Sequence, residues 1–212
     1  MVFRHLRHLR VHRVLAAVVM LGLVSCSTTQ VDRLDDPAAF RAGDARLSCG
    51  STNCALRFRS NARRLGELNA LQLWEPLAAS VLEINYGSDL AYYYLALAAQ
   101  GQDANRAAIG YLRLALESGL RCEDALLADC AGVEVPRAAA RLAGELRTFE
   151  ARRLSLPEDQ AVLKTEQLYT ARVDGSSGPR TTRAIREFQA RRGLQTSGEL
   201  TQETRLALFD AA

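Results

Sequence analysis

Apolar residues recur at helical rather than alternating spacing through the middle of this chain, from Asn61 to about Arg153. Alanine and leucine dominate the stretch, and an apolar side chain every three or four residues forms one face of an α-helix that must be buried. We therefore expect several short helices here and an all-α fold. With 48% hydrophobic and 24% charged residues among 212, the chain has the composition of a folded protein of one medium or two small domains.

The clearest helical pair lies within residues 89–119. Two periodic segments, 90–101 and 107–117, are separated by a short polar turn, which predicts an antiparallel hairpin with small residues where the helices cross. The second segment, with Ala108, Tyr111, Ala115 and Gly119, resembles the second helix of a tetratricopeptide or Sel1-type repeat. The resemblance implies a small helical-hairpin repeat-like array over residues 47–153, because such repeats need neighbours to bury their faces. A generic helical bundle is the alternative.

Repeat arrays of this kind commonly bind other proteins, so residues 61–153 are a candidate surface for a protein partner. Within them, Tyr92, Tyr93 and Tyr94 are candidates to line a peptide groove. Adjacent residues on a helix point in different directions, about 100° apart, so at least one of the three is expected in the core. A helix is also expected over residues 73–84, with Leu73 and Leu77 on its buried face and Tyr86 and Gly87 after its end.

Residues 159–212 carry the most specific pattern in the chain. Polar, glycine and apolar residues recur there in a fixed register: Gln160, Leu163, Leu168, Tyr169, Val173, Asp174, Gly175, Gly178, Pro179, Thr181, Ala184, Ile185, Phe188, Gln189, Gly193, Leu194, Gly198, Leu200, Thr204 and Leu208. This pattern resembles the peptidoglycan-binding domain, a small three-helix module found on many bacterial cell-wall proteins. The chain departs from the family at Gln167 and Ala171, where glycine is usual, so the first helix is expected to end differently.

Much of this pattern specifies the fold without reference to any ligand. Pro179 stands where the first position of a helix is expected, because its missing N–H costs nothing there, and Gly193 is placed to end that helix in a left-handed cap. Thr181, Ile185 and Phe188 share the face of this helix that packs inward. A third helix is expected from about Thr201.

The resemblance implies that the bound polymer is peptidoglycan, whose stem peptides carry carboxylates. Between Arg172 and Arg192 six arginines stand against two acidic residues, an excess of positive charge that suits an acidic polymer. A solvated arginine-rich surface is the alternative. The candidate peptidoglycan-binding residues are Asp174, Gly175, Arg180, Thr181, Arg183, Arg186 and Gln189.

The first 26 residues have the order of an export signal: a basic segment, eleven apolar residues from Val14 to Val24, and small residues. Eleven residues at about 1.5 Å each cover only about half of a ~30 Å hydrocarbon core, so a transmembrane helix is disfavoured. The tetrad ending in Cys26 resembles the lipobox of bacterial lipoproteins. The resemblance implies cleavage after Ser25, acylation of Cys26 by chains such as palmitate, and, because Ser27 follows, sorting to the outer membrane.

After Cys26 the chain is polar and shows little periodicity up to about residue 46, which predicts a flexible tether over residues 26–46. The other four cysteines form two close pairs, Cys49 with Cys54 and Cys122 with Cys130. An exported protein with an even number of cysteines favours two disulfides, and we expect local pairing among the three connectivities. A four-thiolate zinc site is disfavoured because its thiols must be reduced. No metal and no cofactor is expected.

The placement of charge excludes some functions. All three histidines and four of the 27 basic residues lie in the first thirteen positions, and the rest of the chain carries 23 basic against 24 acidic side chains. Nucleic-acid binding therefore loses its electrostatic support. Zinc amidases and the common serine and cysteine hydrolases need histidine, which the chain beyond residue 25 lacks. A carboxylate-dependent glycan hydrolase needs none, but Glu67, Glu75 and Glu83 lack the sequence surroundings of those families.

Together these patterns predict a lipid-anchored, non-catalytic protein of the cell envelope, held on the periplasmic face of the outer membrane, that tethers or senses the cell wall. The expected order is signal peptide 1–25, tether 26–46, repeat-like domain 47–153 and peptidoglycan-binding domain 159–212. One alternative is an adaptor whose repeat-like region recruits a cell-wall enzyme. The other is the glycan hydrolase.

Overall fold

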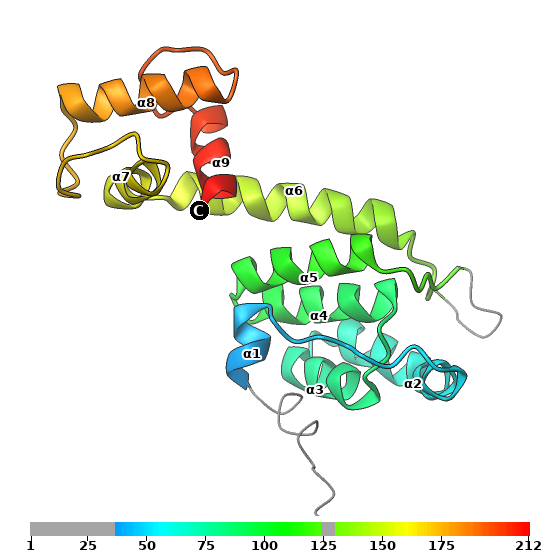
Figure 1. The fold of residues 1–212 in the computed structure, drawn as a ribbon. Helices are drawn as coiled ribbons and strands as arrows, with labels where there is room; N and C mark the ends of the chain where they lie inside the picture. Colours follow the sequence, from blue (N-terminus) through cyan, green and yellow to red (C-terminus); the bar gives the residue numbers. More distant parts are fainter. Residues whose placement is uncertain (1–36, 124–129) are drawn as a thin grey trace, which may run out of the picture. The chain divides into compact units, whose positions relative to one another are not determined.

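The computed structural model of the protein describes residues 37–123 and 130–212, so the predicted export signal, Cys26 and the first part of the tether lie outside the described residues. The described residues contain helices and no strand, which confirms the predicted all-α fold (Figure 1). The helices are α1 (Pro37–Ala42), α2 (Thr52–Ala70), α3 (Trp74–Ile84), α4 (Asp89–Gly101), α5 (Asn105–Glu117), α6 (Val135–Arg153), α7 (Leu156–Thr165), α8 (Pro179–Arg191) and α9 (Gln202–Ala211). None of the helices in these two ranges is long and apolar enough to cross a membrane.

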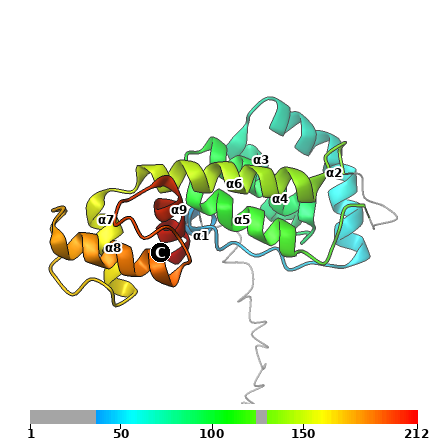
Figure 2. The same ribbon diagram turned by 90° about the horizontal axis from the view of Figure 1, so that it is seen from above.

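Helices α4 and α5 form the antiparallel hairpin that the sequence predicts, with α3 packed on α4 and α6 packed on α5 (Figures 1 and 2). Small side chains lie where the two hairpin helices meet, and Ala98, Ala108 and Ala115 are completely buried. Gly101, in the last turn of α4, has the same role toward α3. A Cβ atom there would come within 2.2 Å of the Trp74 indole ring, so the glycine makes room for that ring.

One side chain of the predicted 73–84 helix does not face the core. Leu77 is completely buried, whereas Leu73 precedes the helix and is 44% exposed. The helix ends at Ile84 because Asn85 takes a left-handed conformation, with φ of 58°. Asparagine tolerates this region better than most residues, because its side chain can hydrogen-bond locally.

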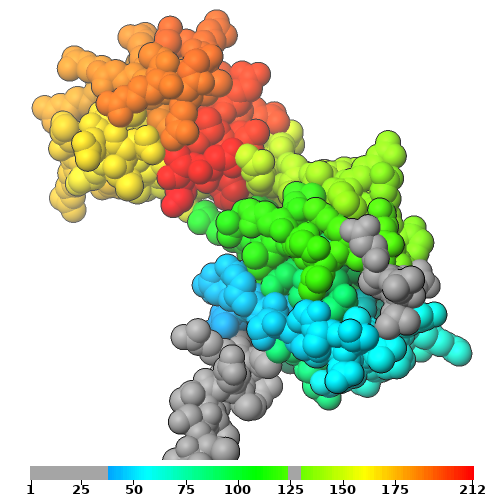
Figure 3. Space-filling view, turned by 45° about the vertical axis from the view of Figure 1, so that its right-hand side comes forward, coloured from blue at the N-terminus to red at the C-terminus, as the bar shows by residue number. Residues whose placement is uncertain are grey.

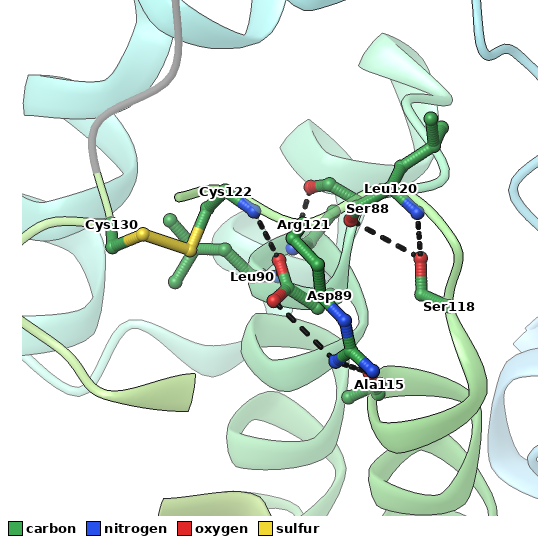
Figure 4. The surroundings of a disulfide bond; sticks show 10 residues. Ser88, Asp89, Leu90, Ala115, Ser118, Leu120, Arg121, Cys122 and Cys130 are labelled. Atoms are coloured by element: carbon green, nitrogen blue, oxygen red, sulfur yellow. Dashed lines mark hydrogen bonds and ion pairs between the residues drawn. A yellow bond between two sulfur atoms is a disulfide. The ribbon is translucent and has the colours of Figure 1, made fainter. Parts of the chain in front are cut away.

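The start of α4 is held by the buried carboxylate of Asp89 and by the hydroxyl of Ser88, which accepts a hydrogen bond from the Ala91 amide at 3.2 Å. Asp89 Oδ1 accepts hydrogen bonds from the backbone N–H groups of Leu90, at 2.7 Å, and of Cys122, at 2.8 Å (Figure 4). The second of these bonds ties the chain after α5 to the start of α4. A carboxylate near a helix N-terminus is also favoured by the helix dipole.

Both cysteine pairs form the local disulfides that the sequence favours, Cys49–Cys54 and Cys122–Cys130. The first joins the segment before α2 to the first turn of that helix. The second lies directly beside the Asp89 network, since the Cys122 amide is one of the donors to that carboxylate (Figure 4). Each disulfide therefore lies beside hydrogen bonds to a distant part of the chain, from Cys49 to Asn85 and Gly87 and from Cys122 to Asp89.

Residues 37–49, which we call the N-terminal segment, differ from the predicted tether from residue 37 onward. They form α1 and then an extended stretch in which Gly43, Ala45 and Leu47 are buried while the residues between them are exposed. The segment lies across the faces of the hairpin helices (Figure 3). A two-residue alternation over so few positions is a weak signal, which explains why the sequence reads as a tether there.

Hydrogen bonds to backbone groups hold the N-terminal segment in place. The Tyr92 hydroxyl accepts from the Leu47 N–H at 2.9 Å and donates to the Leu47 carbonyl at 3.3 Å. The Tyr111 hydroxyl donates to the Phe40 carbonyl at 2.9 Å, and the two aromatic rings stack. Near the end of the segment, the Asn85 side chain accepts from the Ser48 N–H at 2.9 Å.

The tyrosines of α4 therefore do not line an open peptide groove. Tyr92 and Tyr94 are buried, and Tyr92 binds the chain's own N-terminal segment. Tyr93 is half-buried, and burial raises the pKa of its hydroxyl, with Arg141 nearby acting in the opposite direction. The partner of the Tyr92 hydroxyl is Leu47, the first residue of the predicted repeat-like domain, directly after the predicted tether.

Candidate functional site

The C-terminal module consists of α7, α8 and α9 around a small core of its own. Leu163, Phe188 and Leu208 contribute one completely buried side chain from each helix. Helix α8 begins at Pro179, as predicted, and Gly193 follows its end with φ of 67°. Helix α9 is capped by Thr201, whose side chain accepts a hydrogen bond from the Thr204 amide at 3.2 Å. This core fixes the relative positions of the loops that join the helices.

The first helix of the module, α7, ends at Thr165, two residues before the departure from the family pattern at Gln167. Gln167 takes a left-handed conformation with φ of 61°, in the place where glycine is usual. A side chain at positive φ carries a steric cost of the order of 1 kcal/mol, which glycine at this position would avoid. The start of the helix is held by Glu158, which accepts hydrogen bonds from the backbone and hydroxyl of Ser155. These bonds lower the pKa of the Glu158 carboxyl.

A completely buried glutamine holds the loop between α7 and α8. Gln160 Oε1 accepts from the backbone N–H groups of Asp174, at 3.0 Å, and Gly175, at 2.8 Å. Its Nε2 donates to the Ser176 carbonyl at 3.0 Å and to the Thr181 hydroxyl at 3.3 Å. All hydrogen-bonding capacity of this amide is therefore used within the module, which a buried amide requires.

A second completely buried glutamine does the same for the loop between α8 and α9. Gln189 Oε1 accepts from the Gly198 N–H at 2.8 Å. Its Nε2 donates to the Ser197 hydroxyl at 3.2 Å, the Glu199 carbonyl at 2.9 Å and the Thr204 hydroxyl at 2.9 Å. The two glutamines stand in the same relation to the two loops, each paired with the threonine of the following helix. The module thus contains the same arrangement twice: a buried glutamine that hydrogen-bonds to a loop backbone and to the threonine of the following helix.

These networks place four of the seven candidate binding residues in structural roles. Thr181 and Gln189 are buried and belong to the loop-holding bonds described above. Gly175 takes a left-handed conformation with φ of 71°, and a Cβ atom there would lie 3.0 Å from the Pro157 ring. Asp174 accepts from the Ser176 amide at 2.8 Å, and hydrogen bonds to its carboxylate lower its pKa. Asp174 remains exposed and is therefore accessible to a ligand as well.

The three remaining candidates are exposed arginines on α8, and two of them line clefts. Arg183 and Arg186 line a cleft of about 570 Å³ beside the N-terminal end of the helix, with Pro179 and Thr182. Arg186 also lines a second cleft of about 500 Å³ between α8 and the loop of residues 197–200. Arg180 lines neither. Thr182 and Arg186 belong to both clefts, so the two form one concave surface, which we call the α8 groove.

The structure adds two residues that the sequence reasoning did not select. Arg205, on α9, lines the second cleft. Its guanidinium lies 3.3 Å from a carboxylate oxygen of Asp159, which is completely buried on α7. A signal for Asp159 was present in the sequence, since it stands four residues before Leu163 on the face that the helical period assigns to the core. Nothing local in the sequence indicated its partner, because 46 residues separate the two.

This surface can bind an acidic ligand by charge and hydrogen bonding. Three guanidinium groups reach the α8 groove, and guanidinium is the side-chain group that best matches the planar geometry of a carboxylate. Among the described residues, no cluster of three or more histidine, cysteine or acidic side chains could hold a metal ion.

The family model of the Putative peptidoglycan binding domain matches residues 158–208. The match spans most of α7, all of α8 and most of α9, so the C-terminal module is a helical domain of this type. It indicates peptidoglycan binding and association with the cell envelope. It covers about a quarter of the chain. No curated protein and no solved structure compared with the chain is significantly similar to it. The residues that carry the family pattern, among them Gln160, Thr181 and Gln189, are the ones that build the loops of the peptidoglycan-binding domain.

Proposed function

We propose that this protein is a lipid-anchored, non-catalytic peptidoglycan-binding protein of the cell envelope that tethers or senses the cell wall. The observation that carries the proposal is the α8 groove, an arginine-lined concave surface on a domain whose family match indicates peptidoglycan. Rigid loops and exposed guanidinium groups suit recognition of a polymer that bears carboxylates. A non-catalytic role is further supported by Glu67, Glu75 and Glu83, which are all exposed on helices, Glu67 in an ion pair with Arg63.

The binding part of the proposal is tested by sedimentation of the full chain with insoluble peptidoglycan. We expect the wild type to sediment and the double variant Arg183→Gln/Arg186→Gln to lose most of its bound fraction. Arg180→Gln is the control, because it removes one positive charge from the same helix outside both clefts. A wild-type protein that stays in solution contradicts peptidoglycan binding. Equal loss in the variant and the control contradicts the groove. Release of soluble muropeptides would favour the hydrolase.

The anchor part of the proposal rests on the lipobox resemblance at Cys26, with outer-membrane sorting inferred from Ser27. Labelling of cells with a fatty-acid probe tests it directly. We expect label on the wild type and none on Cys26→Ala, whose precursor also keeps its signal peptide. Label retained by Cys26→Ala would exclude acylation at this residue.

An exposed apolar turn favours the adaptor role as a second candidate. Leu71 and Leu73, at the turn between α2 and α3, are 68% and 44% exposed. Exposed apolar side chains gathered at one place are typical of surfaces that bind other proteins. Crosslinking in cells followed by purification tests this role. We expect Leu71→Ser/Leu73→Ser to lose a crosslinked envelope protein that Phe149→Ser, which removes an exposed apolar side chain from α6, retains. Identical crosslinking patterns would exclude the turn.

A further inference from the structure

The second cleft of the α8 groove has the lining expected of a binding site for a negatively charged group. It holds about 500 Å³ between α8 and the loop of residues 197–200, and two cations reach it: Arg186 from α8 and Arg205 from α9. Ser177 and Ser197 add hydroxyl groups, and Glu199 is the acidic residue on its rim. Two guanidinium groups against one exposed carboxylate leave a net positive charge at the cleft.

The walls of this cleft are fixed before any ligand arrives. Gln189 holds both the Gly198 N–H and the Glu199 carbonyl, so the loop cannot move independently of α8. A Cβ atom on Gly198 would lie 2.9 Å from Arg186 Nε, which means that the arginine side chain packs directly against the loop backbone. A preformed cleft spends little binding free energy on ordering its own side chains.

Arg205 has two partners inside the domain. One Nη donates to the Leu154 carbonyl, and the other lies 3.3 Å from Asp159 Oδ2. The Arg205 side chain is 24% exposed, whereas the Asp159 side chain has no exposed surface. The cation can therefore meet a ligand from the cleft while its internal partner stays out of contact with water.

The buried carboxylate of Asp159 has few interactions that offset the loss of its hydration. Neither of its oxygens accepts a hydrogen bond from the described residues, and the contact with Arg205 is an ion pair without hydrogen-bond geometry. Burial raises the pKa of this carboxyl to about 6, against the opposing effect of Arg205, and the charge of Glu158 on the same helix raises it further. Protonation of Asp159 leaves the positive charge of Arg205 without an internal counter-ion.

We propose that the cleft between α8 and residues 197–200 binds a carboxylate of the wall's stem peptides between Arg186 and Arg205, and that Asp159 competes with this carboxylate for Arg205. The proposal rests on peptidoglycan as the ligand and assigns which part of the polymer is bound. It also makes Asp159 a positioning residue that acts through Arg205. Binding of neutral hydroxyl groups of the sugar chain would not require a second guanidinium group, and its affinity would not depend on whether Asp159 is protonated.

Thermodynamic linkage gives the direction of the effect. A ligand carboxylate at Arg205 disfavours the ionised form of Asp159, so binding is accompanied by proton uptake and tightens as the pH falls through about 6. Glu199 and Arg186 are the other charged groups that line the cleft with Arg205, and the comparison with Asp159→Asn separates the contribution of Asp159 from theirs. The change between pH 7.5 and pH 5.5 is therefore assigned to Asp159.

Calorimetric titration of the full chain tests the proposal. The probe is a soluble disaccharide–peptide fragment of the wall with free carboxylates, compared with the same fragment after amidation of those carboxylates. For the wild type we expect about tenfold tighter binding at pH 5.5 than at pH 7.5, with proton uptake measured in two buffers of different ionisation enthalpy. Asp159→Asn should bind tightly at both pH values. The double variant Asp159→Asn/Arg205→Gln, which leaves no unpaired buried carboxylate, should bind weakly at both.

Arg180→Gln is the matched control and should behave as the wild type. Equal binding of the free and amidated fragments would overturn the carboxylate subsite. The same pH dependence in Asp159→Asn as in the wild type would overturn the role of Asp159. Sedimentation separates these outcomes from failure of the broader function. A protein that sediments with insoluble peptidoglycan but ignores the fragment lacks the subsite, whereas a protein that does neither is not a peptidoglycan-binding protein.

Discussion

Gln189 and Thr204 are joined by a hydrogen bond of 2.9 Å between two completely or almost completely buried side chains. The bond links α8 to α9, and the remaining donors and acceptors of the amide are used by the loop of residues 197–199. The α8 groove is bounded by this loop, so the shape of the proposed binding surface depends on an amide that no ligand touches. Stability and recognition are therefore coupled through Gln189.

We expect Gln189→Leu to lower the free energy of unfolding by about 2–4 kcal/mol, because it leaves the buried Gly198 N–H without its acceptor and removes the donor from the Glu199 carbonyl and the Thr204 hydroxyl. Chemical denaturation followed by circular dichroism measures the loss. Gln195→Leu is the matched control, since Gln195 is exposed, and should change stability by less than about 0.5 kcal/mol. Equal effects of the two substitutions would contradict the structural role of Gln189.

We expect the start of the hairpin to depend on the acceptor oxygen Asp89 Oδ1 more than on the negative charge of this side chain. Asparagine keeps an oxygen for the Leu90 and Cys122 amides, whereas alanine leaves both unpaired. We expect Asp89→Asn to cost about 1 kcal/mol and Asp89→Ala about 3 kcal/mol in unfolding free energy. Thermal unfolding of the two variants side by side measures the difference. If asparagine is as damaging as alanine, then the ion pair with Arg121, at 3.8 Å, is the dominant interaction.

The N-terminal segment should loosen when the Tyr92 hydroxyl is removed. Tyr92→Phe loses both hydrogen bonds to Leu47 and leaves that buried backbone pair without its partner. We expect amide hydrogen exchange at Leu47 to accelerate about tenfold, which corresponds to a loss of about 1.4 kcal/mol. Tyr93→Phe, on the same helix, should leave this exchange rate unchanged. Unaltered protection in Tyr92→Phe would mean that the contacts of Asn85 and Tyr111 hold the segment without the Tyr92 hydroxyl.

The features predicted from sequence are those with a local cause. The hairpin of α4 and α5 is predicted by the helical spacing of its apolar residues and by a polar turn, and the start of α8 is predicted by Pro179. Each of these signals lies within a few residues of the feature that it predicts. The C-terminal pattern includes Gln160 and Gln189, but their burial was not predicted, and two of the predicted binding residues, Thr181 and Gln189, are buried. These two side chains are polar because they form the hydrogen bonds that hold the loops. The sequence alone does not distinguish such a polar residue from one that contacts a ligand.

The features missed depend on residues distant in sequence. Leu47 meets Tyr92 across 45 positions, and Asp159 meets Arg205 across 46. The N-terminal segment has no helical period and too little apolar surface to predict its burial, so its order comes from the surface on which it lies. Asp159 lies on the apolar face of its helix, but the cation that compensates it comes from α9, and only packing of the three helices brings the two together.

Asp159 should give the protein a pH-dependent stability. Its pKa is raised in the folded state from an ordinary value of 3.8 to about 6, so the native state binds more protons than the unfolded state between these values. The free energy of unfolding therefore falls as the pH rises through this window, by an amount on the order of 3 kcal/mol. Above pH 6 the full destabilisation by the buried carboxylate is present, and below about pH 4 it is absent.

Thermal unfolding of the full chain from pH 4 to pH 7.5 measures this effect against Asp159→Asn, which has no ionisable group at the position. Because other groups titrate in both proteins, the quantity of interest is the difference between the two melting temperatures. We expect the variant to gain stability relative to the wild type as the pH rises from 4 to 6, and the difference to stay constant above that range. A difference that does not change with pH would show that Asp159 titrates as an ordinary carboxyl, with Arg205 fully compensating its burial.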